Sequence, residues 1–269
     1  MSLNITILGC GSSAGVPRVG QGWGACDPSN PKNRRRRCSI LVEKPGDARL
    51  RAEPTRLLVD TGADCREQLL GQNVNRLDAV LLTHAHADHV HGLDDLRPLV
   101  MEMRHRIPCY LDQPTWDAVG LRFDYMFVTP SYSNYPPLLT HNPLTHGVGF
   151  AVEGSAGPIE AMPFTLDHGD IDALGFRFGN AAYSPDVKRV PTQSMDFLRG
   201  LDLWIVDALR YTPHPTHLSL GETLQLIAEL KPKRAVLTNM HTDLDYETLR
   251  GQLPENVVPA YDGMKLTVD

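Results

Sequence analysis

The stretch of sequence that decides the fold runs from residue 79 to residue 93: Ala79-Val-Leu-Leu-Thr-His-Ala-His-Ala-Asp-His-Val-His-Gly-Leu93. Its first four residues have the composition of a buried strand, and four ligand-type side chains follow within six positions. Because alternate residues of an extended chain share a face, the first two histidines can point to one spot. Imidazole with carboxylate suits Zn²⁺, Mn²⁺ or Fe²⁺, and no cysteine lies in the cluster to complete a closed structural zinc site. The predicted metal ligands are His84, His86, Asp88 and His89.

Three more candidate ligands follow predicted strands elsewhere in the chain. The four residues His84, His86, Asp88 and His89, called the tetrad below, cannot complete the ligand sets of two metals. Other parts of the sequence must therefore contribute ligands. Taken singly, each candidate could also be an ordinary loop histidine or a turn aspartate. As a set at strand ends, they reinforce one another. They are His168, Asp186 and His241, after the predicted strands 159–166, 181–183 and 235–237.

The rest of the chain alternates short apolar runs with helical patterns, which predicts an α/β fold. The clearest helix is 220–230, with Ser219 as its N-cap. Two segments, 20–37 and 124–150, look irregular, and the second is either a lid or a surface excursion. The other predicted strands are 3–8, 39–42, 57–59, 79–82, 109–111, 176–178, 203–206, 257–260 and 266–268, and the weaker helices are 65–70, 93–103, 115–123, 192–198 and 246–253.

Composition restricts the class of protein. With 269 residues, 42% hydrophobic and 22% charged, the chain is an ordinary globular one, long enough for one large domain or two small ones. Since no linker is evident, we expect a single domain over 1–269. A net charge of −6 is poor for general nucleic-acid binding, and no apolar run is long enough to span a membrane. Five scattered cysteines and no signal-peptide pattern favour the cytoplasm.

The motifs resemble those of the metallo-β-lactamase-fold hydrolases over nearly the whole chain. The tetrad segment 83–89, followed by Gly92, carries the resemblance, together with Leu58-Val-Asp-Thr-Gly62 and the order of the later candidate ligands. The resemblance implies an αββα sandwich with a dinuclear metal site at one edge of its two sheets. By the same resemblance, Asp60 should orient a tetrad histidine by a hydrogen bond; the alternative is a simple turn cap.

Within that superfamily the chain is similar to the PhnP-type phosphodiesterases, which open a phosphoribosyl 1,2-cyclic phosphate. The segments 8–17, 37–39, 216–220 and 261–264 carry the likeness. It implies one metal on His84, His86 and His168, a second on Asp88, His89 and His241, and Asp186 between them. Two departures stand out. Cys26 lacks the companion cysteines of that family's structural zinc site, and Asn239 occupies the place of its last ligand histidine.

The resemblance also implies a mechanism. Two divalent ions, Zn²⁺ or Mn²⁺, would share a hydroxide that attacks phosphorus, with Asp88 counted as a catalytic residue as well as a ligand. His217 is the candidate proton donor to the leaving group, with neighbouring His214 left open and a purely structural His217 as the alternative. Backbone groups of Gly11, Ser12 and Ser13 could contact a phosphate. The run Arg34–Arg37 is either a solvated face or a phosphate contact.

We therefore expect a phosphodiesterase acting on a small cyclic phosphate or a nucleotide-like molecule. The expected partner is a small phosphorylated substrate rather than a long nucleic acid or a membrane, and the chain could form a homodimer. Three other functions remain open: an endonuclease of the transfer-RNA 3′-end processing type, a thioester or lactone hydrolase, and a metal-binding module without turnover.

Overall fold

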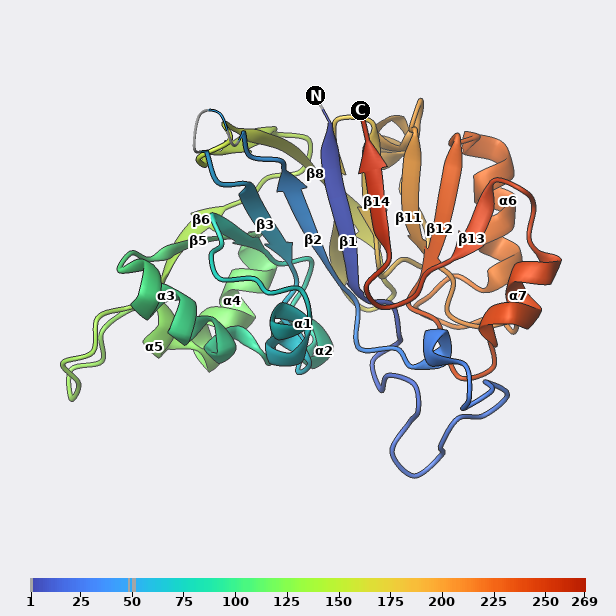
Figure 1. The fold of residues 1–269 in the computed structure, drawn as a ribbon, viewed down its shortest axis with the longest axis horizontal. Coiled ribbons are helices and arrows are strands. Elements are labelled where there is room, and N and C mark those ends of the chain that lie inside the picture. The colour runs from blue at the N-terminus through green and yellow to red at the C-terminus, as the bar shows by residue number, and fades with distance from the viewer. Residues whose placement is uncertain (1, 48, 50–51) are drawn as a thin grey trace.

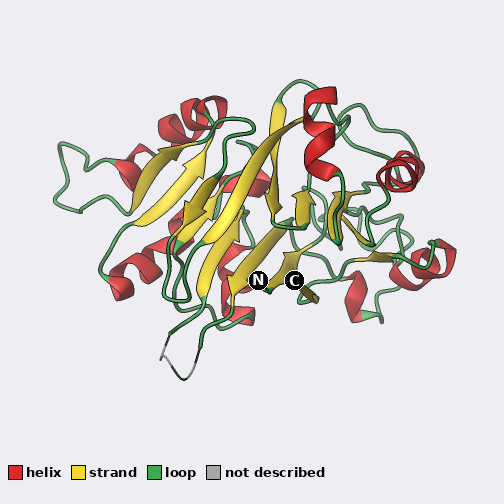
Figure 2. Ribbon diagram, turned by 90° about the horizontal axis from the view of Figure 1, so that it is seen from above, coloured by secondary structure: helices red, strands yellow, loops and turns green. Residues whose placement is uncertain are grey.

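The computed structural model describes residues 2–47, 49 and 52–269. Two seven-stranded sheets face each other, and helices cover their outer sides (Figures 1 and 2). The first sheet has the order β14-β1-β2-β3-β4-β5-β6. Its strands are β1 (Leu3–Gly9), β2 (Ser39–Lys44), β3 (Thr55–Val59), β4 (Ala79–Leu81), β5 (Ile107–Leu111), β6 (Leu139–Pro143) and β14 (Lys265–Val268).

The second sheet has the order β13-β12-β11-β10-β9-β8-β7. Helices α1 to α5 lie beside the first sheet, and α6 and α7 lie beside the second, at the right of Figure 1. The strands are β7 (Phe150–Val152), β8 (Ile159–Asp167), β9 (Asp172–Phe178), β10 (Ala181–Ser184), β11 (Leu203–Asp207), β12 (Arg234–Thr238) and β13 (Val257–Pro259). The helices are α1 (Cys65–Gly71), α2 (Ala87–Val90), α3 (Arg97–Met103), α4 (Gln113–Arg122), α5 (Asp124–Phe127), α6 (Leu220–Leu230) and α7 (Tyr246–Gln252), with 3₁₀ turns at Pro31–Asn33, Leu93–Leu96 and Thr192–Leu198.

The alternation of side chains along β3 explains the layering. Leu57 and Val59 point into the core between the two sheets, whereas Leu58 points into the core under α1 to α5. A strand buried on both faces needs apolar residues at every position, so it reads as a continuous apolar run. The same division holds for β4, where Ala79 and Leu81 face one core and Val80 the other. The expected αββα sandwich is confirmed.

The direction of the central strands gathers the functional loops at one edge. β3, β4, β5 and β6 run parallel to one another, and so do β10, β11, β12 and β13. Parallel strands place their carboxyl ends at the same edge, where loops from both sheets meet. The loops after β3, β4, β10, β11 and β12 are therefore neighbours, although they lie far apart in the sequence.

Helix α6 shows how closely local sequence sets an element. It begins and ends where the apolar pattern predicts, at Leu220 and Leu230. The Ser219 side chain accepts a hydrogen bond from the Glu222 backbone N–H, and the Glu222 carboxylate accepts one from the Ser219 backbone N–H. Together they form a capping box. Lys231 then turns into the left-handed region and ends the helix.

The segment 124–150 differs from the expectation of one irregular excursion. It contains α5 and the strand β6, and the loop 128–138 between them extends outward at the left of Figure 1. Tyr132 and Tyr135 in that loop are 89% and 69% exposed, so they cover nothing. β6, with the sequence Leu-Thr-His-Asn-Pro, is too polar to be recognised, because an edge strand needs little apolar surface.

Within the described residues, no helix is long and apolar enough to cross a membrane. All five cysteines are buried and unpaired with one another. The cytoplasmic location and the single domain stay predictions.

Candidate metal centre

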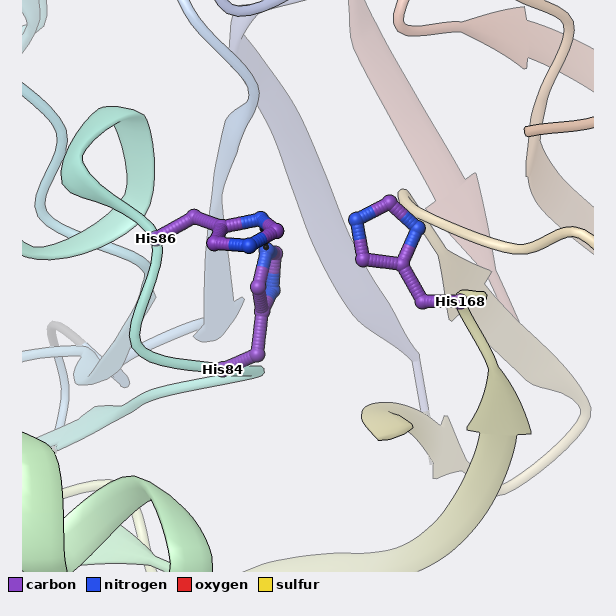
Figure 3. Close-up of side chains that lie close together, drawn as sticks. All are labelled: His84, His86 and His168. Atoms are coloured by element: carbon purple, nitrogen blue, oxygen red, sulfur yellow. Dashed lines mark hydrogen bonds between the residues drawn. The ribbon is translucent and has the colours of Figure 1, made fainter. Parts of the chain in front are cut away.

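The loop after β4 carries the first two histidines to the edge where the sheets meet. His84 and His86 follow β4, His86 in extended backbone, and His84 Nε2 lies 2.9 Å from His86 Nδ1. Helix α2 begins at the next residue, Ala87, so the chain turns and carries Asp88 and His89 to a neighbouring position. Figure 3 shows the rings of His84 and His86 side by side, with His168 facing them from the loop after β8.

Asp60 lies behind the tetrad, in the loop after β3. Its side chain is completely buried, and its Oδ2 accepts a hydrogen bond from His89 Nδ1 at 2.8 Å. The backbone N–H of Thr83 donates to the Asp60 Oδ1 at 2.8 Å, and the Thr83 hydroxyl also donates to the carboxylate. Asp60 thus fixes the ring of His89 with Nε2 directed away from β3, the orientation that a ligating histidine needs.

Two glycines allow the β3 loop to approach the tetrad closely. A Cβ on Gly62 would lie 2.0 Å from the Asp88 carbonyl oxygen, and a Cβ on Gly92 would lie 2.2 Å from that of Gly62. The backbone N–H groups of Thr61 and Gly92 also form hydrogen bonds across this contact. Any side chain at Gly62 or Gly92 would push the Asp60 loop away from the helix that carries Asp88 and His89.

The opposite side of the site comes from the second sheet. His168 follows β8, Asp186 follows β10, and His217 lies in the loop between β11 and α6. His168 Nδ1 donates to the Thr216 carbonyl at 2.8 Å, and His217 Nδ1 donates to the Asp207 Oδ2 at 2.8 Å. Each ring therefore has an acceptor behind its Nδ1, which leaves Nε2 free toward the centre.

Asp186 is the residue on which both sides converge. Its Oδ1 lies 3.3 Å from His89 Nε2, and its Oδ2 lies 3.6 Å from His168 Nε2. His84 Nε2 and His217 Nε2 each lie 4.0 Å from the same Oδ2. Asp186 is 3% exposed, and its Oδ1 has no hydrogen-bond partner among the residues that the structure describes. A buried carboxylate oxygen surrounded by imidazole Nε2 atoms has the surroundings of a cation ligand.

The electrostatics divide the imidazoles into two kinds. Burial lowers the pKa of His84, His86 and His168, which keeps these rings neutral and able to offer a lone pair. Burial also disfavours the charged form of His89, but the carboxylates of Asp186, Asp60 and Asp88 outweigh it and raise the pKa of His89. Three carboxylates around one imidazole mark a position of negative potential, where a cation is favoured.

The donor atoms fit a pair of divalent cations. Three overlapping groups each hold their ligand atoms within 4.8 Å of one another. Neutral imidazole with carboxylate, and no thiolate, is a donor set for Zn²⁺, Mn²⁺ or Fe²⁺. Asp186 belongs to two of the groups, and two sets that share a carboxylate are consistent with a dinuclear site. The groups are His84, His86 and His168; His84, His89 and Asp186; and His168, Asp186 and His217.

Asp88 and His241 line the same cavity but belong to none of these three groups. Asp88 remains near, with its Oδ2 3.4 Å from His89 Nε2. His241 lies farther out, since its Nε2 is hydrogen-bonded to Arg18 and its Nδ1 lies 3.5 Å from Asp243 Oδ1. His217 lies nearer to Asp186, with its Nε2 4.0 Å from Asp186 Oδ2, and the ligand role of His241 stays a prediction.

Asp207, which the sequence analysis missed, supports His217. It ends β11, is completely buried, and also accepts a hydrogen bond from the Val187 backbone. Burial raises the pKa of the Asp207 carboxyl. Burial also disfavours the imidazolium of His217, but the contact with Asp207 outweighs it and raises the pKa of His217. Asn239 completes this surrounding, with its amide 3.2 Å from His217 Nδ1. The sequence feature that could have pointed to Asp207 is its position at the end of a predicted strand, the same feature that pointed to Asp186.

The glycine-rich loop after β1 contributes less backbone than expected. The N–H of Gly11 donates to the Arg36 carbonyl and the N–H of Ser12 to that of Met240, so neither is free for a phosphate. Ser12 and Ser13 do line the cavity, whereas Gly11 does not. Ser12 is 3% exposed, and its hydroxyl has no hydrogen-bond partner within the described part of the chain.

The arginine run has mixed roles. Arg36 pairs with Asp262 and Arg37 with Asp64, while Arg34 is exposed. Arg35 is buried and donates to the carbonyl oxygens of His241 and Leu244, which ties the β1 loop to the loop after β12. Its Nη1 also lies 3.8 Å from Cys26 Sγ. None of the four lines the cavity of the candidate metal centre.

Comparisons with known proteins agree with this geometry. The chain matches the family described as Beta-lactamase superfamily domain over residues 55–240. A crystal structure described as a new diphosphatase from the PhnP family has 35% sequence identity to the chain and a TM-score of 0.87. That similarity covers 100% of this chain and 98% of the other.

Two curated relatives match part of a longer protein. An octanoyltransferase of Porphyromonas gingivalis is 31% identical over 267 residues, which cover 98% of this chain and 51% of that protein. A ribonuclease Z of Bradyrhizobium sp. is 31% identical over 163 residues, which cover 57% of this chain and 48% of that protein. The chain thus spans about half the length of these curated relatives. By its family match, its two-sheet architecture and its cluster of histidine and aspartate ligands, the chain belongs to the metallo-β-lactamase-fold hydrolases.

Proposed function

We propose that the protein is a metal-dependent phosphodiesterase that hydrolyses a small cyclic phosphate or a nucleotide-like diester. One observation carries the proposal: Asp186 belongs to two overlapping ligand groups, and His217 directs its Nε2 at Asp186. The buried carboxylate of Asp207 holds the other ring nitrogen of His217. Similarity to a PhnP-family diphosphatase over the full chain supports the phosphorus chemistry. The curated relatives are about twice as long as the part that matches, so their activities do not enter the proposal for this chain.

The candidate ligands form two sets, one for each metal. His84, His86 and His168 would hold one cation, and His89, Asp88 and Asp186 would hold the second, a division that the short distances among their ligand atoms support. Such a pair of cations would lower the pKa of a bound water and would supply positive charge to a phosphate. Zn²⁺ and Mn²⁺ both suit these donors, and the metal content of the purified protein decides between them.

In this proposal His217 donates the proton that the leaving alkoxide requires. The buried Asp207 holds its Nδ1 at 2.8 Å, so the ring presents Nε2 to the cavity. Burial disfavours the imidazolium, but the contact with Asp207 outweighs it and raises the pKa of His217, which favours the protonated form that a general acid needs. His214 lies beside it, with ring centroids 5.1 Å apart, but burial lowers the pKa of His214. His217 is therefore the better donor of the two.

The cavity sets the size of the substrate. Its volume is about 400 Å³, in the range of small-molecule sites. A phosphorylated sugar or a nucleotide matches that volume, and a folded RNA would have to insert a single-stranded end. We therefore propose a small phosphorylated substrate as the partner, while a homodimer stays a prediction.

A substrate panel tests the proposal. The purified protein, loaded with Zn²⁺ or Mn²⁺, should hydrolyse bis(p-nitrophenyl) phosphate and adenosine 2′,3′-cyclic phosphate. Hydrolysis of thioesters or lactones alone would overturn the phosphodiester assignment. The ribonuclease Z relatives supply a second candidate; cleavage of a transfer-RNA precursor with no activity on the small diesters would favour it.

The variant His217→Ala tests the proton donor. Loss of a general acid typically costs about 10²–10⁴ in kcat, so kcat should fall by that amount while metal content stays unchanged. Loss of one metal per chain would instead make His217 a ligand. Unchanged kcat on a substrate with a poor leaving group would remove His217 from the mechanism.

A further inference from the structure

Arg35 is a buried cation that the proposed mechanism does not use. Its side chain is 1% exposed, and it does not line the cavity of the candidate metal centre. Among the described residues, no carboxylate forms an ion pair with its guanidinium, whereas the neighbouring Arg36 and Arg37 pair with Asp262 and Asp64. A buried charge without a counter-ion is costly unless hydrogen bonds replace its water. The hydrogen bonds of Arg35 therefore show what it does in the fold.

The guanidinium holds both ends of one turn in the loop after β12. Its Nη1 donates to the His241 carbonyl at 3.1 Å, and its Nη2 donates to the Leu244 carbonyl at 2.6 Å. The Leu244 N–H also donates to the His241 carbonyl, so the two carbonyl oxygens belong to a single tight turn. A planar guanidinium can bridge two acceptors in this way, whereas an ammonium group is a single point of charge.

The main chain of Arg35 is fixed to the β1 loop. Its N–H donates to the Val16 carbonyl at 2.9 Å, and its carbonyl accepts from the Val16 N–H at 2.9 Å. Val16 lies two positions before Arg18, whose side chain lines the cavity. The Arg35 Nη2 also donates to Asn33 Oδ1 at 3.3 Å, and that oxygen accepts the Tyr246 N–H. Arg35 therefore joins the β1 loop to the loop after β12 and to the start of α7.

Cys26 belongs to this connection as a contact of Arg35. Its Sγ lies 3.8 Å from the Arg35 Nη1, and its side chain is 3% exposed. Among the described residues, no group of potential metal ligands includes Cys26. Two aspartates of the loop after β12, Asp243 and Asp245, bond to other groups, a backbone N–H and a side-chain amide. The guanidinium is thus the central group of a polar cluster that is built without metal ligands.

The turn that Arg35 holds carries His241 into the cavity. The His241 N–H donates to the Leu209 carbonyl, and its own carbonyl accepts from Arg35, so its main chain is fixed on both sides. The His241 Nε2 is hydrogen-bonded to Arg18, and its Nδ1 lies 3.5 Å from Asp243 Oδ1. Arg18 and His241 come from the two loops that Arg35 joins. A shift of one loop against the other would separate them, and a misplacement of about 1 Å can cost an enzyme about 10²-fold in rate.

We propose that Arg35 is a positioning residue of the candidate active site: its buried guanidinium fastens the β1 loop to the loop after β12 and so sets the places of Arg18 and His241 in the cavity. The inference rests on the proposed function only in taking this cavity as the place of the reaction. The sequence left the arginine run open between a solvated face and a phosphate contact, and for Arg35 the inference is neither.

Chemical rescue of Arg35→Ala tests the proposal. The variant should lose about 10- to 100-fold in kcat/KM on bis(p-nitrophenyl) phosphate, because both loops are released. A low, non-denaturing concentration of guanidinium chloride should restore part of that loss, since the free cation can bridge the same carbonyl oxygens. Urea, a neutral molecule of similar shape, and sodium chloride at equal ionic strength should restore none. A variant that is only less stable would gain nothing, because guanidinium favours the unfolded chain.

Arg34→Ala is the matched control, because Arg34 is the exposed neighbour of Arg35 and lies outside the cavity. It should keep the wild-type kcat/KM with or without guanidinium. Arg35→Lys is a milder variant that keeps the charge; it should also lose kcat/KM, since one ammonium group cannot bridge the two carbonyl oxygens. Wild-type kcat/KM in Arg35→Lys, or a loss in Arg35→Ala that guanidinium does not reduce, would overturn the proposal.

Hydrogen exchange separates this inference from the proposed function, because it needs no turnover. In Arg35→Ala, the amides of Ala25 and Met240, which bond across the two loops, should exchange at least about tenfold faster, while the Thr83 amide beside Asp60 stays unchanged. If the protein hydrolyses no diester but exchanges in this way, the proposed function fails and the role of Arg35 stands. Exchange equal to that of Arg34→Ala, or faster exchange at Thr83 as well, would overturn the role of Arg35.

Discussion

The two sides of the candidate metal centre are built in different ways. The side from the first sheet is local: His84, His86, Asp88 and His89 lie on one loop and one short helix, and Asp60 supports them from the adjacent strand. The side from the second sheet is assembled from separate loops after β8, β10 and β11, each of which contributes one residue. A motif can be recognised in the first case, whereas only the fold brings the residues together in the second.

The contacts that support the histidines also differ between the two sides. Asp60 and His89 are at most 1% exposed and are held by backbone as well as side-chain bonds. His217 keeps 14% of its side chain exposed, and its loop is held from outside by Lys188 and Glu222. The support behind His89 is thus fully buried, whereas the support of the His217 loop reaches the partly exposed pair of Lys188 and Glu222. Substitutions on the two sides should therefore differ in kind, in metal retention on the first and in substrate handling on the second.

The largest effect should come from the residue that joins the two sides. Asp186→Asn keeps the shape but removes the charge between the ligand groups. Metals contribute several kcal/mol to phosphoryl transfer, so loss of their shared carboxylate should lower kcat/KM by about 10³-fold and reduce metal content. Elemental analysis and kinetics measure both. Asp202→Asn, which breaks a surface pair with Lys233, is the control and should change neither. A fall of less than tenfold in Asp186→Asn would mean that the two sides act separately.

Asp60→Asn tests the support behind the first side. The neutral amide orients His89 less firmly, and substitution of such supporting groups costs about 10–100-fold in metal affinity. Competition with a chelator measures the affinity. Asp78→Asn is a matched control, because Asp78 is also a buried, hydrogen-bonded aspartate of the first sheet but lies at the far end of β4. Equal metal affinity in the two variants would show that Asp60 only stabilises the fold.

Gly62→Ala tests the close approach of the Asp60 loop. The added Cβ would lie 2.0 Å from the Asp88 carbonyl oxygen, so the loop must shift, at a cost of about 1–3 kcal/mol in the free energy of unfolding. Gly251→Ala is the control: in helix α7 its Cβ meets open space, and the helical preference of alanine should stabilise the protein by about 0.5–1 kcal/mol. Denaturant unfolding measures both, and equal effects would contradict the predicted clash.

The smallest effect should come from the outer support of the second side. The partly exposed Glu222 carboxylate loses some solvation on burial, but bonds from Lys188 and Ser219 outweigh this and lower its pKa from 4.5 to about 2. Its contribution to stability is therefore present above pH 4.5 and is lost as the pH falls toward 2. Glu222→Gln should destabilise the protein by less than about 1 kcal/mol at pH 7, because solvent screens the contact.

Denaturant unfolding at pH 7 and pH 2 checks the sign of this effect. The difference between Glu222→Gln and the wild type should shrink at the lower pH. A difference that grows at pH 2 would mean that the carboxylate is not the stabilising group.

The sequence predicted much of the fold because its signals are local. Buried strands such as β4 appear as apolar runs, and α6 carries both its apolar face and its cap. β6 and β7 were missed, since edge strands are short and have little apolar surface. Resemblance added the sandwich of two sheets, which periodicity does not reveal.

Site prediction shows the same limit. The tetrad could be found because four potential ligand residues within six positions of the sequence also lie close together in space. Asp207 gave only the weaker signal of an aspartate at a strand end, because its partner His217 lies ten residues away. The hydrogen bond between Arg18 and His241 joins residues more than two hundred positions apart, and the sequence gives no sign of it. His217 and His241 illustrate the difficulty, because each lies in a loop next to a helix or strand of the second half of the chain. Only the structure shows that His217 lies beside Asp186 and His241 beside Arg18.

By itself, the sequence determined a strand that ends in a cluster of imidazole and carboxylate groups, because covalent neighbours at those spacings are held within a few ångströms whatever the rest of the chain does. Tertiary structure alone decided which distant residues complete the site. Parallel strands of two facing sheets end at one edge, and only their packing brings Asp186, Asp207 and His217 to the tetrad and Arg18 and Arg210 into the same cavity.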